Sequence, residues 1–296
     1  MQELNGSSVI RFSDVGGAIA LSEGVNEFTW TVVGGSTPQF KFVAPSGSGG
    51  VITDVRISTV GTPSLIKSYS NTNGSAITIN HLGSERDGSV EVNNLTINNI
   101  AGEGLLVNEL IQGFEVVRIS NVNAFNTSSA VRVAGSNQNV YIKNLSGTKT
   151  RNRGDDGTKF ISVSNDVGDL MGDCIVDGVN IQYGGDGTHI FFSGGRLRNI
   201  ISNVTVSKWG YYLDSLGNEV AYENTSGTDT ARIDVPGGAI IKLDPVYYDQ
   251  EMKYVINNLN ISETNDTSDL FQPIVFNANG AVDVVINNIV SDITRS

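Results

Sequence analysis

The fold is decided by the stretch VINNLNI at positions 255–261, where valine, isoleucine and leucine alternate with polar residues on both sides of Asn258. The same phrase recurs along the chain, in whole or in part, as VNNLTI at 92–97, VRISNV at 117–122, VYIKNL at 140–145, ISNVTV at 201–206 and VINNI at 285–289. A variant with glycine in place of the asparagine is IVDGVNI at 175–181, and weaker copies are TDVRI at 53–57 and ITIN at 77–80. Self-similarity at intervals of a few tens of residues indicates a repeat architecture.

The repeats differ in length. Their central residues are Asn94, Asn121, Asn144, Gly178, Asn203, Asn258 and Asn288, so that most intervals span 23 to 34 residues. The interval from Asn203 to Asn258 is 55 residues, which leaves room for one unmarked copy. We expect that copy around ARIDV, at positions 231–235.

The phrase has a specific physical meaning. Alternation with a period of two places valine and isoleucine on one face of a β-strand. Asparagine tolerates the left-handed backbone region and bonds to local backbone, so it is suited to a corner between two short strands. Two strands that meet at such a corner once per repeat describe one turn of a parallel β-helix, and stacked turns would place the amides in a ladder.

This interpretation assigns a side to individual residues. We expect the core to include Val140, Ile142, Leu145, Val204, Val206, Leu259 and Ile261, and we expect the outer face to include Tyr141, Lys143 and Thr205. The alternative fold is a β-sandwich, whose strands also alternate and recur every 8 to 12 residues or so. A sandwich does not explain an asparagine at the same position of every repeat. The sequence therefore predicts an all-β parallel β-helix, a solenoid.

The domain organisation follows from where the repeats begin. We expect residues 1–45 to form an amino-terminal cap region and residues 46–296 to form the parallel β-helix. Residues 16–24, GGAIALSEG, are the nearest approach to a helical stretch, and they are suited to cap the first repeat. An uncovered end would expose strand edges and apolar core.

Composition and charge restrict the partners. Among 296 residues, 17% are charged and the net charge is −12, without a run of lysine or arginine that would bind nucleic acid. No apolar stretch approaches the roughly 18 residues that a membrane-spanning helix needs, so we expect no membrane insertion. Neutral partners such as uncharged glycans are favoured over polyanions. The single cysteine, Cys174, excludes a disulfide framework and a cysteine zinc site, and we expect it to be a small buried apolar residue. The sequence predicts no cofactor and no metal site.

The repeated phrase, its asparagine corners and the abundance of glycine, serine and asparagine resemble the right-handed parallel β-helices of the pectate-lyase-like superfamily. The low charge is most similar to that of bacteriophage tailspikes and related virion β-helix proteins. The resemblance covers about residues 45–296 and is one of pattern. It implies a homotrimer of side-by-side β-helices on the virion surface, in contact with other virion proteins and with bacterial surface glycan. The expected function is that of a virion structural protein of spike, fibre or capsid-decoration type.

The alternative function is a tailspike-like polysaccharide depolymerase, a glycoside hydrolase or lyase that uses paired carboxylates roughly 5 to 10 Å apart. The sequence GDDG at 154–157 is the nearest match to the paired aspartates of polygalacturonases, although their Gly-His-Gly and Arg-Ile-Lys companions are absent. A plain turn between repeats is the competing interpretation of this stretch. The candidate catalytic residues for an enzyme are Asp155, Asp156, Asp186, Asp214 and Asp249.

Two aromatic clusters mix rings with carboxylates: KWGYYLD at 208–214 and DPVYYDQEMKY at 244–254. Such surfaces bind sugars, because rings cover apolar sugar faces and acids accept hydroxyl hydrogen bonds. Tyrosine and tryptophan are equally enriched at interfaces between protomers. Core packing is a third interpretation. The residues predicted to form a binding or interface surface are Trp209, Tyr211, Tyr212, Tyr247 and Tyr248.

Overall fold

The structure is a computed structural model of the chain. It describes residues 9–12, 18–20, 40–43, 50–53, 75–81, 85–98, 103–109, 112–127, 129–149, 159–165, 171–183, 188–213, 218–221, 239–245, 251–264, 273–277 and 282–292. This part of the chain is all-β and contains no helix, and therefore none that could cross a membrane.

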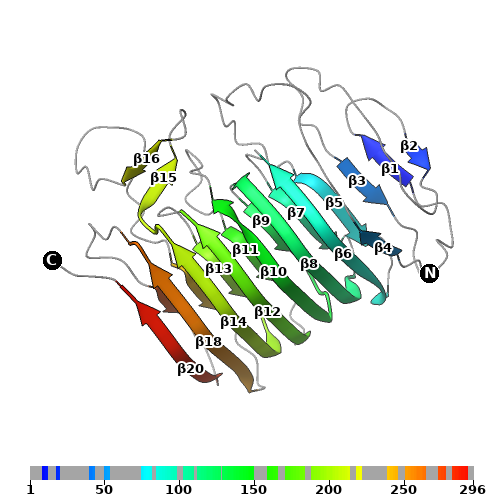
Figure 1. The fold of residues 1–296 in the computed structure, drawn as a ribbon. Helices are drawn as coiled ribbons and strands as arrows, with labels where there is room; N and C mark the ends of the chain where they lie inside the picture. The colour runs from blue at the N-terminus through cyan, green and yellow to red at the C-terminus, as the bar shows by residue number, and fades with distance from the viewer. Residues whose placement is uncertain are drawn as a thin grey trace, which may run out of the picture.

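The strands form two large sheets and one small one (Figure 1). The ten-stranded sheet has the order β19 (Ile274–Phe276), β17 (Ile241–Asp244), β13 (Thr188–Ser193), β11 (Lys159–Ser164), β9 (Ser129–Val133), β7 (Glu103–Glu109), β5 (Ser75–His81), β3 (Phe40–Val43), β1 (Val9–Phe12) and β2 (Ala18–Ala20). The eight-stranded sheet has the order β20 (Val282–Ser291), β18 (Met252–Ser262), β14 (Arg196–Ser207), β12 (Met171–Gln182), β10 (Asn139–Lys149), β8 (Phe114–Thr127), β6 (Asp87–Asn98) and β4 (Gly50–Thr53). The small sheet is the antiparallel hairpin of β15 (Tyr211–Leu213) and β16 (Glu219–Ala221).

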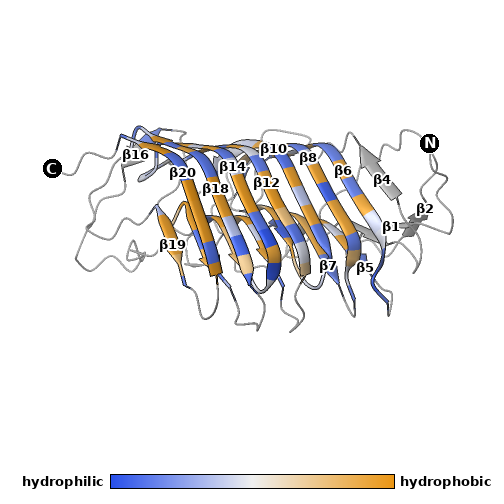
Figure 2. Ribbon diagram, turned by 90° about the horizontal axis from the view of Figure 1, so that it is seen from below, coloured by the Kyte–Doolittle hydropathy of each residue, from blue (hydrophilic) through white to orange (hydrophobic). Residues whose placement is uncertain are grey.

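From β3 onward the chain alternates between the two large sheets, apart from the hairpin, and the strands of each sheet pair in parallel, whereas β1 pairs antiparallel with both β2 and β3. Figure 2 shows the two sheets as separate layers, with apolar and polar residues alternating along the strands of the eight-stranded sheet. Because the strands from β3 to β20 pair in parallel within each of the two large sheets, the structure is not a sandwich of two antiparallel sheets. The arrangement is compatible with a β-helix-like fold.

The predicted corners are confirmed. In the eight-stranded sheet each long strand carries one residue with positive φ at its centre, and these residues are Asn94, Asn121, Asn144, Gly178, Asn203, Asn258 and Asn288. The asparagines have φ between 54° and 58°, and the glycine has φ of 73°. Pairing between neighbouring strands skips this residue and resumes immediately after it, as between Lys143↔Asp177 and Leu145↔Val179. The left-handed residue therefore bends the strand without disturbing its register.

The core follows the predicted sides of each strand. All seven residues expected inside are at most 1% exposed: Val140, Ile142, Leu145, Val204, Val206, Leu259 and Ile261. Lys143 is exposed, and Tyr141 and Thr205 are half-buried on the opposite face. Cys174 is buried as expected, and burial raises the pKa of its thiol to about 12. Side chains of one type stack from repeat to repeat, because parallel register brings equivalent positions together.

One expectation about the repeats needs correction. The prediction of an unmarked repeat between Asn203 and Asn258 is wrong, because β14 pairs directly with β18 and β13 pairs directly with β17. The 55-residue interval instead contains the β15–β16 hairpin, and residues 231–235 lie outside the described part of the chain. Ala18–Ala20, within the stretch at 16–24 expected to cap the first repeat, form a strand that pairs antiparallel with β1 at the end of the ten-stranded sheet.

Candidate functional site

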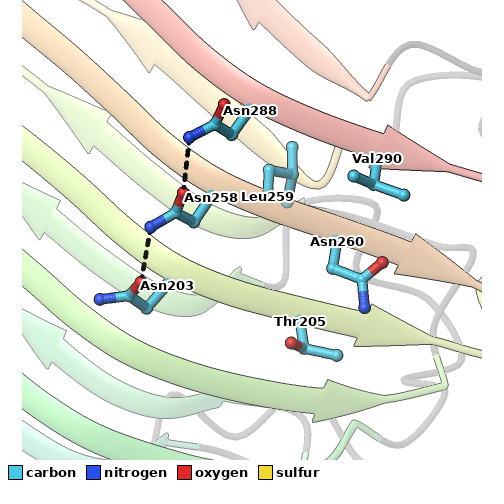
Figure 3. Close-up of a pocket in the computed structure, with 7 residues that line it drawn as sticks. All are labelled: Asn203, Thr205, Asn258, Leu259, Asn260, Asn288 and Val290. Atoms are coloured by element: carbon cyan, nitrogen blue, oxygen red, sulfur yellow. Dashed lines mark hydrogen bonds between the residues drawn. The ribbon is translucent and has the colours of Figure 1, made fainter.

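A groove lies on the outer face of β14, β18 and β20, beyond the corners of these three strands (Figure 3). Its volume is about 320 Å³, and its lining consists of Asn203, Thr205, Asn258, Leu259, Asn260, Asn288 and Val290. We call it the amide groove. None of its lining residues is charged, so that its polar chemistry comes from amides, one hydroxyl and backbone.

One wall of the amide groove is a ladder of side-chain amides. Nδ2 of Asn258 donates to Oδ1 of Asn203 at 2.9 Å, and Nδ2 of Asn288 donates to Oδ1 of Asn258 at 3.1 Å (Figure 3). Farther along the sheet, Asn144 donates to Asn121 in the same direction, at 3.1 Å. The ladder holds each amide in one orientation. Because an amide has two N–H donors and two acceptor lone pairs, each rung keeps capacity for a ligand.

At Gly178, which has no side chain, the amide of Asn203 is bonded instead by the residue before the corner. Oδ1 of Asp177 accepts hydrogen bonds from Nδ2 of Asn203 and from the hydroxyl of Ser202, both at 2.7 Å. These two hydrogen bonds, first that of Ser202 and then that of Asn203, lower the pKa of the Asp177 carboxyl. Asp177 therefore remains ionised at neutral pH and anchors the three asparagines that line the groove.

The other wall of the amide groove is formed by the next outward-facing position of each strand. Thr205 pairs with Asn260 across β14 and β18, and Asn260 pairs with Val290 across β18 and β20. Asn260 and Val290 are exposed, and Thr205 is half-buried. The groove therefore offers neutral donors and acceptors in rows that cross the strands, together with one apolar side chain.

A charged cluster stands three residues beyond the second wall, at the ends of the strands. Lys208, after β14, forms an ion pair with Glu219 of β16 and a longer one of 3.9 Å with Glu263, after β18. The hydroxyl of Tyr183, after β12, donates to Glu219 at 3.4 Å, and the lysine nitrogen lies 5.6 Å from the centre of the Tyr183 ring. The hydrogen bond to Glu219 raises the pKa of Lys208. The cluster ties the hairpin to the body of the protein.

The backbone of this cluster is unusual. Tyr183, Lys208 and Glu263 have φ of 66°, 57° and 53°, values that non-glycine side chains rarely adopt. Such conformations persist only where the surroundings enforce them, and they concentrate at functional positions. Here they turn three neighbouring strands in the same way at the point where the hairpin leaves the sheet.

Of the first aromatic cluster, Trp209 is buried, and its ring centre lies 4.7 Å from that of His189. Burial lowers the pKa of His189 to about 3, and its Nε2 lies 2.9 Å from the carbonyl oxygen of Tyr183. Tyr211 is half-buried in β15. Tyr212 belongs to the same strand, and its side chain lies outside the described residues.

The remaining predicted site residues are Asp155, Asp156, Asp186, Asp214, Asp249, Tyr247 and Tyr248, and all of them lie outside the described residues. Their roles stay predictions, as does the role of Trp209, Tyr211 and Tyr212 in an interface or in glycan contact. Within the ranges that the structure describes, no group of three or more histidine, cysteine, aspartate or glutamate side chains is placed to hold a metal ion.

Sequence reasoning did not single out the amide groove. It treated the asparagines as corners and did not ask what lies beside them. The signal was present, because the second position after each corner faces outward, and it is Thr205 in one repeat and Asn260 in the next. The long interval after β14 was a second signal, since insertions in repeat proteins commonly gather on a binding face.

No family model matches the chain, and no curated protein or solved structure is significantly similar to it.

Proposed function

We propose that the protein is a right-handed parallel β-helix that serves as a structural component of a bacteriophage virion, of spike, fibre or decoration type, and that the amide groove contacts host surface glycan. The observation that carries this proposal is the amide ladder with its adjoining row of neutral polar side chains. The protein would act on the particle surface as a homotrimer, together with other virion proteins.

Three features support the β-helix. Successive strands alternate between two parallel sheets, every repeat bends at the same left-handed residue, and the amides of the corners bond from repeat to repeat. Connections between parallel strands of one sheet are almost always right-handed, which supports the proposed hand.

The chemistry of the groove supports a neutral glycan. Sugar hydroxyls need donors and acceptors in fixed positions, and the ladder supplies both with their orientation set in advance. The net charge of −12 opposes polyanions. Carboxylates and the Tyr183 ring at the strand ends extend this surface with groups that suit sugar hydroxyls and apolar sugar faces.

A second outer surface supports the homotrimer. One aliphatic residue of each of β12, β14, β18 and β20 pairs in register with that of the next strand: Ile175, Ile200, Val255 and Val285. Because side chains alternate along a strand, these four lie on the face opposite to that of their core-facing neighbours. All four are half-buried on the outer face before the corners. We call them the aliphatic row. A continuous apolar row on a sheet face is typical of a contact with another protein chain.

The glycan proposal is tested with a panel of immobilised neutral O-antigen and capsular polysaccharides. The variant T205V/N260A removes a hydroxyl and an amide from the groove, and the control T96V/N180A removes the same groups from the same outward row on β6 and β12, outside the groove. With about 1 kcal/mol for each lost hydrogen bond, we expect binding to fall about thirtyfold in the groove variant only.

Equal binding by the groove variant and the wild-type protein would contradict the proposal. Steady release of new reducing ends from a polysaccharide of the panel would instead favour the depolymerase. In that case the five candidate aspartates become the residues to substitute next.

A further inference from the structure

The last described strand of the eight-stranded sheet, β20, has exposed apolar side chains at positions that are buried in the neighbouring strand. Val284, Ile286 and Ile289 are 39%, 45% and 43% exposed. They pair in register with Tyr254, Ile256 and Leu259 of β18, which are at most 2% exposed. The three side chains of β20 therefore occupy core positions that are covered on the β18 side and open on the other.

The backbone of β20 is open on the same side. The strand is ten residues long and pairs along one edge only, with β18, so that it ends the sheet in Figure 1. An edge of this length with an apolar face presents unpaired N–H and C=O groups in the order that a further strand requires.

The hydrogen bonds of the amide ladder all run in one direction, and this determines which hydrogen-bonding groups the open edge presents. Nδ2 of Asn288 donates to Asn258 at 3.1 Å, and Nδ2 of Asn287 donates to Asn257 at 2.9 Å. Both donors thus point back towards β18. In the described part of the chain no side chain donates to Oδ1 of Asn287 or Asn288, so that the ladder ends in two acceptors.

We propose that the outer edge of β20 is a strand-addition site for a partner protein, which supplies one parallel strand with the apolar alternation of the repeat and amide donors at its corner. The apolar residues of that strand cover Val284, Ile286 and Ile289. Its two corner amides donate to Asn287 and Asn288 and continue the ladder. This surface is separate from the amide groove and does not depend on glycan binding.

A partner fits this edge better than a second copy of the chain. The opposite end of the same sheet is β4, whose Thr53 pairs with Asn93, the residue before the corner, and the residue that follows Thr53 in the sequence is an aspartate, which carries no amide donor. The end of the other sheet is the antiparallel pair of β1 and β2. Two copies stacked end to end would therefore bring no corner amide from a described strand to Asn288.

The test uses a peptide with the chemistry that the site requires. The segment MKYVINNLNIS, residues 252–262, already pairs with β20 on its inner edge and carries the apolar positions and both amides. A fluorescent form of this peptide is titrated with the whole protein, and hydrogen exchange locates the contact. A matched N257D/N258D peptide keeps the shape and replaces both donors by acceptors.

We expect saturable binding of the first peptide, slower exchange of the amides of β20 with no change in β8, and at least tenfold weaker binding of the N257D/N258D peptide. Absence of binding, equal binding of both peptides, or protection elsewhere than β20 would overturn the proposal. Concentration-dependent self-association that is abolished by Ile286→Lys would also overturn it, because the occupant would then be a second copy.

Discussion

Asn144 illustrates at the scale of one residue what a corner requires. Its φ is 54°, and its amide donates to Asn121. The left-handed region costs a residue with a Cβ atom about 1–2 kcal/mol. Asparagine offsets this cost by local hydrogen bonds, and glycine adopts the region freely. Gly178 occupies the same position one repeat later, which shows that the backbone conformation alone is sufficient for the bend.

We therefore expect Asn144→Gly to lower the free energy of unfolding by about 1 kcal/mol through the lost ladder bond. Asn144→Ala should lower it by about 2 kcal/mol or more, because the backbone strain is added. Urea unfolding of both variants measures the difference. An alanine variant as stable as the glycine variant would mean that the left-handed conformation is not what asparagine provides.

His189 gives the protein a predictable response to acid. Burial lowers its pKa from 6.5 to about 3, so that the unfolded chain binds a proton that the folded protein excludes between these two pH values. Stability from this residue is complete above pH 6.5 and is lost as the pH falls, with a slope approaching about 1.4 kcal/mol per unit.

Replacement of the histidine by an uncharged ring isolates this effect. We expect the unfolding free energy of His189→Phe to fall less steeply between pH 6.5 and pH 4.5 than that of the wild-type protein, in urea titrations at a series of pH values. Other groups, including Asp177, contribute equally to both proteins. Parallel pH profiles would show that His189 is not the buried neutral group described above.

At the scale of the strand, the position of a repeat in the stack decides what its side chains contribute. Ile142 of β10 and Ile286 of β20 occupy the same row of the core, and they are 0% and 45% exposed. An interior repeat has a neighbour on each side, whereas β20 has one.

This pair provides a matched test. We expect Ile142→Ala to lower the free energy of unfolding by about 2–5 kcal/mol, as for other buried isoleucines, and Ile286→Ala to lower it by about 1 kcal/mol or less. Chemical denaturation of the two variants checks the difference. A large loss in the β20 variant would indicate that its isoleucine is covered in solution.

The strands also show where prediction from sequence succeeds and where it ends. The corners and core positions could be predicted, because alternation and the left-handed tolerance of asparagine act over a few neighbouring residues. The direct pairing of β14 with β18 could not, since local alternation in ARIDV looks the same whether or not the segment joins a sheet. The amide groove depends on that pairing, because it brings Thr205 beside Asn260.

At the scale of the whole molecule, the aliphatic row is the surface on which the proposed trimer depends. We expect I200K/V255K to dissociate the oligomer, because it places two charges in an apolar contact that must be free of water. Light scattering measures the mass of the variant against the wild-type protein. Asn180 is exposed on β12 beyond the corner. The control Asn180→Lys adds a charge outside the aliphatic row and should leave the mass unchanged. A wild-type protein that is a monomer at high concentration would exclude the trimer.

The direct contact between β14 and β18 has a consequence for how such a protein changes over time. The chain leaves the stack after Ser207 and returns to it in β17, from Ile241, and β14 and β18 still pair in register, with Val204 beside Leu259. The pairing of β14 with β18 does not depend on the length of the segment that joins them. That segment can therefore be lengthened, shortened or exchanged while the paired strands keep their register. Evolution, or an engineer who grafts a foreign loop, can alter the segment between β14 and β18 and leave the two large sheets intact.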